Sequence, residues 1–254
     1  MSRKSKRAPL PKSEADTMLR ELTEGAAKVF HNAEDLYTEA SALHRAGALS
    51  RAYFLHQISL EECAKIEMLG AWATSVLTGM ERDVQKVTVA FASHKAKNYT
   101  NAYFLPATEA ESDARRDKRW HDALEAFKQQ QAEFHLESNS AKNASLYVDV
   151  HKGVFTAPKD RVTEAMVTKI AEANEELLGA AHAKVEMMTR WLNNPDKVRD
   201  LMQWFETRLK ELMAELEDPQ EAMSVILDEM LTRAKQTGYS EAMNIGAQRG
   251  KTDK

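Results

Sequence analysis

The residues that break helices are few in this chain and stand far apart. Its 254 residues include only 9 glycines and 6 prolines, whereas alanine, glutamate, lysine, leucine and methionine, which favour the helical state, are abundant. Long stretches without breakers bury apolar surface most simply as amphipathic helices that pack together. The sequence therefore predicts an all-α bundle.

Breakers and capping residues delimit the expected helices. Ser13 begins an acidic first turn and can cap the first helix, which Gly47 ends. Gly79 can end the second helix as the left-handed residue that follows the last turn, and Pro106 ends the third. The predicted helices span residues 13–45, 49–77, 81–104, 108–137, 161–192, 196–217 and 219–236.

One segment departs from the helical pattern. Residues 138–144 have the composition of a loop, and the β-prone runs 146–150 and 153–156 follow them. These runs predict a small β-hairpin insert near residues 146–157. Side chains at alternate strand positions share a face, and the face that contains Tyr147, Asp149 and His151 is suited to contact with a partner.

The segments group into three expected parts. Residues 1–12 form a basic tail that we expect to be disordered. Residues 13–195 form the helical domain with its hairpin, and residues 196–254 form a C-terminal helical extension that frays from Gly238.

Charge and composition exclude several classes of protein. The net charge of −4 gives no general attraction to nucleic acid, so RNA binding would need a local basic patch. The single Cys63 excludes an internal disulfide and a zinc site made of cysteines. No apolar run is long enough to span a membrane, and the N-terminus lacks the pattern of a secretory signal. We expect a cytoplasmic protein without a cofactor.

Polar residues occur among apolar ones on two of the predicted helices. At 100° per residue, Glu62 and Lys65 share a face of helix 49–77 with apolar residues. His94 and Asn98 share a face of helix 81–104 in the same way. The two faces comprise Arg51, Phe54, Leu55, Ile58, Glu62, Lys65 and Leu69, and Val87, Ala90, Phe91, His94, Asn98, Asn101 and Leu105. Buried charges need partners, so we expect one buried polar site between the two helices.

Three interpretations of this polar site are open. In the first it is an acid–base and phosphate-binding site, in which Glu62 raises the pKa of His94 and lysines attract phosphate. In the second it is a satisfied polar network that fixes the register of the helices. In the third it holds a metal, although its lysine and the absence of a Glu-x-x-His pattern argue against that. The residues concerned are Glu61, Glu62, Lys65, His94, Lys95, Lys97 and Asn98.

Three motifs in a fixed order resemble the AbiV family of bacterial abortive-infection proteins, within the wider group of HEPN helical domains. The resemblance covers about residues 20–195. It implies a HEPN-like bundle, a role in defence against phage, a homodimer and, as in many HEPN proteins, cleavage of RNA. We expect the defence to act on RNA or on translation, with a phage protein as the trigger. The matching segments are Arg51-Ala-Tyr-Phe-Leu with Leu60-Glu-Glu-Cys-Ala-Lys65, Phe91-Ala-Ser-His-Lys-Ala-Lys97, and Leu146-Tyr-Val-Asp-Val150 with Phe155-Thr-Ala-Pro158.

Arg51 and His56 have the spacing of the Arg-x4–6-His motif that HEPN ribonucleases carry. In that chemistry the arginine holds the scissile phosphate, the histidine transfers a proton, and the 2′-hydroxyl of RNA is the nucleophile, so that no metal is needed. Positions five apart lie 140° apart on a helix, so both side chains would meet only at a cleft between two copies. The alternatives are a surface or packing role for the pair, and a non-enzymatic protein that blocks a host process by contact.

Overall fold

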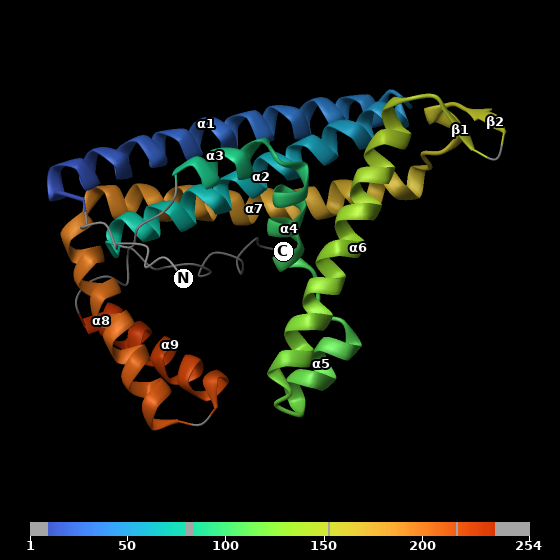
Figure 1. Ribbon diagram of the computed structural model, residues 1–254. Helices are drawn as coiled ribbons and strands as arrows, with labels where there is room; N and C mark the ends of the chain where they lie inside the picture. Colours follow the sequence, from blue (N-terminus) through green and yellow to red (C-terminus); the bar gives the residue numbers. More distant parts are fainter. Residues whose placement is uncertain (1–9, 80–83, 152, 217, 237–254) are drawn as a thin grey trace, which may run out of the picture. The chain divides into compact units, whose positions relative to one another are not determined.

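The computed structural model describes residues 10–79, 84–151, 153–216 and 218–236, and it confirms the all-α fold with a small hairpin (Figure 1). Most of the predicted tail and the whole predicted frayed end lie outside these residues. The elements are α1 (Lys12–Arg45), α2 (Leu49–Leu77), α3 (Val84–Ala92), α4 (His94–Asn101), η1 (Ala102–Phe104), α5 (Glu109–Arg116), α6 (Trp120–Leu146), β1 (Asp149–His151), β2 (Val154–Thr156), η2 (Pro158–Asp160), α7 (Glu164–Asn193), α8 (Pro195–Glu215) and α9 (Pro219–Gln236).

The first two helices end where the sequence predicts. Gly47, between α1 and α2, has φ 75°, and Gly79, after α2, has φ 67°. Only glycine adopts this left-handed conformation without steric cost. The predicted bounds of both helices are therefore confirmed to within one residue.

Two of the predicted helices are interrupted. Residues 81–104 were expected to form one helix, but Ser93 separates α3 from α4, and its hydroxyl accepts a hydrogen bond from the backbone N–H of Ala96 at 3.2 Å. A serine side chain that bonds the backbone in this way starts a new helix. The predicted helix 108–137 is likewise divided, and Lys118 in the break has φ 57°.

The predicted loop over residues 138–144 is wrong, because α6 continues to Leu146. Ser138, Lys142 and Ser145 are buried there, so packing outweighs the weak helix propensity of serine and asparagine. The hairpin is confirmed but shorter than expected. Its antiparallel strands pair Val150 with Phe155 at the centre.

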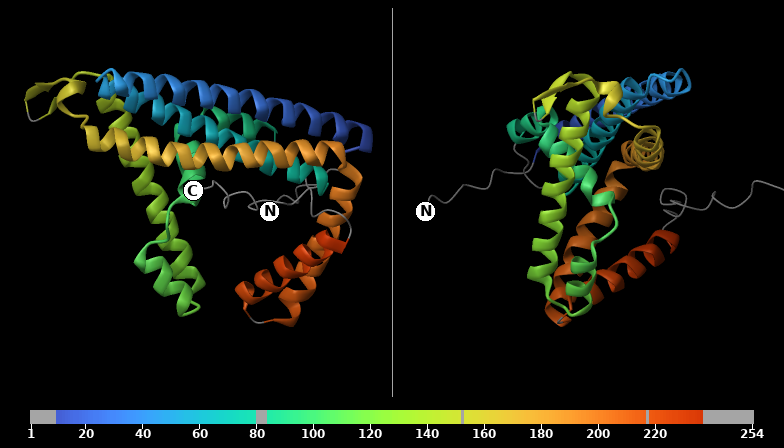
Figure 2. Two further views of the ribbon diagram at one scale, coloured as in Figure 1. Left: turned by 180° about the vertical axis from the view of Figure 1, so that it is seen from behind. Right: turned by 90° about the vertical axis from the view of Figure 1, so that its right-hand side faces the viewer.

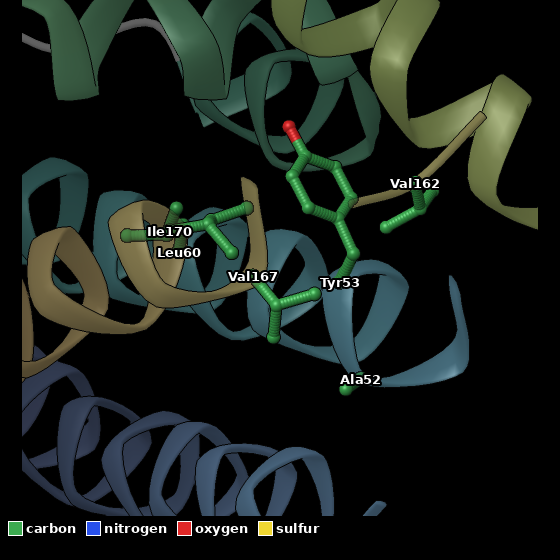
Figure 3. Close-up of a cluster of buried hydrophobic side chains, with 6 residues drawn as sticks. All are labelled: Ala52, Tyr53, Leu60, Val162, Val167 and Ile170. Carbon is green, nitrogen blue, oxygen red and sulfur yellow. The ribbon is translucent and has the colours of Figure 1, made fainter. Parts of the chain in front are cut away.

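The described chain divides into two compact units whose boundaries fall inside α1, α2 and α7. One unit comprises residues 24–71 and 82–184, and contains α3 to α6 and the hairpin. Within it α1, α2 and α7 run alongside one another, α6 is steeply inclined to them, and α5 lies beside the first part of α6 (Figures 1 and 2). Its core joins α2 to α7 through a cluster of buried side chains (Figure 3), namely Ala52, Tyr53, Leu60, Val162, Val167 and Ile170.

The other unit comprises residues 1–23, 72–81 and 185–254. In it α8 and α9 pack through the buried side chains of Leu212, Ala222 and Ile226. The guanidinium of Arg208 donates to both carboxylate oxygens of Glu229, at 2.9 and 3.0 Å, which fixes the register of this helical pair. Within the described residues, no helix is long and apolar enough to cross a membrane.

We expect Ser93→Ala to lower the free energy of unfolding by about 1 kcal/mol, because the start of α4 loses its side-chain acceptor. Urea denaturation measures the change. Ser140→Ala, at an exposed position inside α6, is the matched control and should shift stability by less than about 0.5 kcal/mol. Equal effects of the two substitutions would show that the hydroxyl of Ser93 does not cap α4.

Candidate functional site

A buried carboxylate with three nitrogen partners lies at the centre of the larger unit. Glu61 is 1% exposed. Nζ of Lys142 donates to its Oε1 at 2.8 Å, Nζ of Lys97 lies 2.7 Å from its Oε2, and Nδ1 of His94 lies 2.6 Å from the same oxygen. We call Glu61, His94, Lys97 and Lys142 the Glu61 cluster.

Three helices bring the cluster together. Glu61 comes from α2, His94 and Lys97 come from the first turn of α4, and Lys142 comes from the last part of α6. His94 and Lys97 are three positions apart, so they lie on one face of α4. The cap at Ser93 starts α4 immediately before them, and thus fixes where that face points. Asn101 of α4 also donates to the backbone oxygen of Leu60 at 2.8 Å, which holds α4 against α2 beside Glu61.

The cluster has more positive than negative charge. Both lysine side chains are buried, at 7% exposed for Lys97 and 8% for Lys142, and they share one carboxylate. Burial alone raises the pKa of Glu61, but hydrogen bonds from Lys142, Lys97 and His94 outweigh burial, and the pKa is lowered. Glu61 is therefore a fixed anion at neutral pH, and each ammonium is compensated only in part.

His94 is the member of the cluster that reaches the surface. Its side chain is 53% exposed. Because Nδ1 faces an ionised carboxylate, it carries the hydrogen and donates to Glu61, which leaves Nε2 as the nitrogen directed away from that bond. His94 thus has one ring nitrogen held by Glu61 and a side chain that is half exposed.

A second imidazole lies beside the cluster. Nδ1 of His135, on α6, is 3.2 Å from Nδ2 of Asn98, which follows His94 by one turn of α4. Asn98 is fully buried, and its Oδ1 has no partner within the described residues. Burial and the positive charges of Lys95 and Lys142 lower the pKa of His135, although Glu61 opposes them.

Tyr99 completes this side of the site. Its ring packs edge-on against His135, with 6.0 Å between the ring centroids, and the ammonium of Lys95 lies 5.1 Å from the centroid of the same ring. Lys95 itself is exposed. The predicted residues Glu61, His94, Lys95, Lys97 and Asn98 therefore lie in one region of the structure.

Glu62 and Lys65 form a separate pair. Nζ of Lys65 donates to Oε1 of Glu62 at 2.5 Å, so the expected contact within α2 exists. The expected contact of Glu62 with His94 is replaced by a contact of Glu61 with His94. Adjacent helix positions differ by 100°, and α2 is buried on most of its circumference, so the sequence pattern did not show which of the two carboxylates faces α4.

Arg51 and His56 do not meet. Arg51 is exposed and lines an open cavity of about 390 Å³ with residues that follow the hairpin, Pro158 and Lys159. His56 is fully buried in the core, where Nδ2 of Asn174 lies 3.1 Å from its Nδ1. A second copy of the chain cannot contact an imidazole enclosed in this way, so we assign His56 to packing. The homodimer itself stays a prediction, which light scattering can test against the monomer mass of 28.7 kDa.

Two members of the site, Lys142 and His135, were missed by the sequence analysis. Lys142 fell in the segment expected to be a loop, 81 positions from Glu61. His135 lay on the predicted helix 108–137, but no other polar residue on that helix indicated that it belonged to a site. Their spacing of seven, two turns on one helix face, is the signal that a correct bound for α6 would have given. The described residues contain no group of three or more His, Cys, Asp or Glu side chains that could hold a metal.

Comparison with known proteins places this site in a family. Residues 21–179, more than half of the chain, match AbiV, a family of HEPN domains, and this range includes the whole Glu61 cluster with Asn98 and His135. Uncharacterized protein y4gJ of Sinorhizobium fredii (strain NBRC 101917 / NGR234) is 46% identical over 107 residues, which are 42% of this chain and 56% of the relative. The chain thus spans little more than half the length of that relative. No solved structure matches the chain. The motifs, the helical fold with its hairpin and the match over residues 21–179 agree, and the chain belongs to the AbiV family.

Proposed function

We propose that this protein acts in abortive-infection defence against phage by cutting RNA at the Glu61 cluster. Membership of the AbiV family supports the role in defence. The observation that supports action on RNA is the arrangement of cations around a half-exposed imidazole. Two buried lysines share the one carboxylate that orients His94.

The members of the site have different parts in this proposal. Lys97 and Lys142 are buried, so they act through the positive potential that they add rather than by gripping the substrate. The exposed Lys95 and the exposed part of His94 are the groups that a phosphodiester meets. RNA carries its own nucleophile in the 2′-hydroxyl, so proton transfer and charge stabilisation by these side chains suffice for cleavage.

We expect His94→Ala to abolish protection against phage and to reduce RNA cleavage by about 10²- to 10⁴-fold, because a positioned proton-transfer group is lost. The melting temperature should change little, since half of the His94 side chain is already solvated. Cell survival after infection, RNA integrity and a thermal melt are the measurements. His121→Ala, at an exposed position on α6, is the matched control and should behave as the wild type.

Two results would contradict the proposal. Wild-type protein that protects cells while total RNA and purified RNA stay intact would exclude action on RNA. A His94→Ala protein that loses its melting transition together with its activity would show that His94 serves the fold.

A second function, contact with another protein, is favoured by the hairpin. Val148, Val154 and Phe155 are 62%, 65% and 78% exposed, which is unusual for apolar side chains so close together. β1 and β2 form a two-stranded sheet, so each strand also has one unpaired edge to which an extended segment can add. We propose that a phage protein binds here, either as the trigger of the RNA-directed activity or, in a non-enzymatic mechanism, as the partner itself.

We expect Phe155→Ser to abolish protection in infected cells while RNA cleavage by the purified protein stays at the wild-type rate, because the substitution removes only exposed apolar surface. The comparison of the two assays separates recognition from catalysis. Thr163→Ser, at another exposed position after the hairpin, serves as a control for handling and expression. Full protection by Phe155→Ser would exclude the centre of β2 as the contact surface.

A further inference from the structure

The second imidazole beside the Glu61 cluster has a role that follows from its position. His94 and Asn98 are one turn apart on α4, about 6 Å. His94 shares Glu61 with Lys142, and Asn98 contacts His135, two helical turns before Lys142 on the same face of α6. The two imidazoles therefore lie on adjoining helices, and His94 is near enough to His135 to contribute to the shift of its pKa.

We propose that His135 is the general base of RNA cleavage and that His94 is the general acid, an assignment that rests on the proposed action on RNA. His135 removes the proton of the 2′-hydroxyl as the 2′-oxygen bonds to phosphorus. The bond from phosphorus to the 5′-oxygen breaks, and His94 gives its proton to that oxygen. The products are a 2′,3′-cyclic phosphate and a 5′-hydroxyl, and the two rings then exchange their protons with water.

Asn98 supports a change of protonation at His135. Its amide is fully buried, Nδ2 faces the imidazole, and Oδ1 has no partner within the described residues. Rotation of the amide by half a turn brings Oδ1 to Nδ1 of His135. Nδ1–H then donates to Asn98, and Nε2 is free to accept a proton. The same bond is kept when the ring is charged, so Asn98 is the positioning residue of the base.

The surroundings of the two rings favour this division of roles. Burial and the positive charges of Lys95, Lys142 and His94 lower the pKa of His135, although Glu61 opposes them, which keeps its ring neutral and ready to accept a proton. His94 is held at Nδ1 by the carboxylate of Glu61, so Nε2 is the ring nitrogen from which it gives its proton to the leaving oxygen.

RNA with a sulfur in place of the 5′-oxygen at the cleavage position distinguishes base from acid, because a thiolate leaves without a proton. On natural RNA we expect His94→Gln and His135→Gln each to slow cleavage by about 10²- to 10⁴-fold. On the sulfur-containing RNA, His94→Gln should return to near the wild-type rate, and His135→Gln should stay slow. The affinity for RNA, measured by fluorescence anisotropy at the same salt concentration for all proteins, should be little changed in both variants.

The outcomes separate this assignment from the function on which it rests. Wild-type protein that cleaves neither RNA overturns both. If the wild type cleaves and His94→Gln does not, but His135→Gln retains the wild-type rate, the role of His135 is overturned and the proposed function stands. Rescue of His135→Gln by the sulfur-containing RNA would reverse the two roles. His121→Gln, on the same helix and exposed, is the matched control for substitution of a histidine.

Discussion

Glu61→Gln is expected to lower the free energy of unfolding by about 3–5 kcal/mol, because it removes the countercharge of two buried ammonium groups. The substitution preserves size, so packing is nearly unchanged, but one of the two accepting oxygens becomes an NH₂ group that cannot accept a hydrogen bond from lysine or histidine. Lys97 and Lys142 have only 7% and 8% of their side chains exposed. Within the described residues, both would be left without a carboxylate partner. Urea denaturation at neutral pH measures the loss.

A double substitution tests whether this loss comes from the unpaired charge. Lys142→Met in the Glu61→Gln background removes one of the two uncompensated ammonium groups and keeps an unbranched apolar side chain of similar length. It should therefore recover part of the lost stability. Glu62→Gln is the matched control, and its effect should stay below about 1 kcal/mol, because its partner Lys65 is partly exposed and can turn to water. Equal losses for Glu61→Gln and Glu62→Gln would contradict the central place of Glu61.

The second large effect is a loss of stability in mild acid that originates at His56. Burial, with the positive charge of His44, lowers the pKa of His56 from 6.5 to about 4. Between these values the unfolded chain binds a proton that the folded protein excludes, so stability falls as the pH drops from 6.5 to 4. The difference corresponds to about 3 kcal/mol at most.

The contribution of His56 is isolated by comparing two variants over this range. His56→Gln can keep a hydrogen bond to Asn174 but does not titrate, so its free energy of unfolding should fall less steeply between pH 6.5 and pH 4 than that of the wild type. His31→Gln, which replaces an exposed histidine of α1, should retain the wild-type slope. Parallel curves for wild type and His56→Gln would contradict the assignment. Glu61, whose pKa is lowered by hydrogen bonds from Lys142, Lys97 and His94, is present in all three proteins, so its contribution cancels in the comparison.

Local chemistry fixed the parts of this fold that the sequence could predict. Gly47 and Gly79 end helices because each adopts a left-handed backbone conformation that is free of steric cost only for glycine. Pro106 ends a predicted helix because it has no N–H to donate. These causes act within a few residues. Helical periodicity in turn predicts one polar site between helices 49–77 and 81–104, the region in which Glu61, His94, Lys95 and Lys97 lie.

The remaining features depend on contacts between residues far apart in the chain. The helical state of residues 138–144 comes from burial of Ser138, Lys142 and Ser145, which no local pattern indicates. The choice between Glu61 and Glu62 as the partner of His94 depends on how α2 is rotated beneath α4. His135 and Lys142 enter the site because α6 packs on α4, and their spacing of seven marks a shared helix face only once residues 138–144 are known to be helical.

The separation of Glu61 from Lys142 by 81 positions has a consequence for how the protein is made. The ribosome synthesises Glu61, then His94 and Lys97, and only much later the end of α6. Until α6 is complete, the carboxylate lacks Lys142, its last partner, and Asn98 of α4 lacks His135. A growing chain is thus without a finished site until the end of α6 has been synthesised and has left the ribosome.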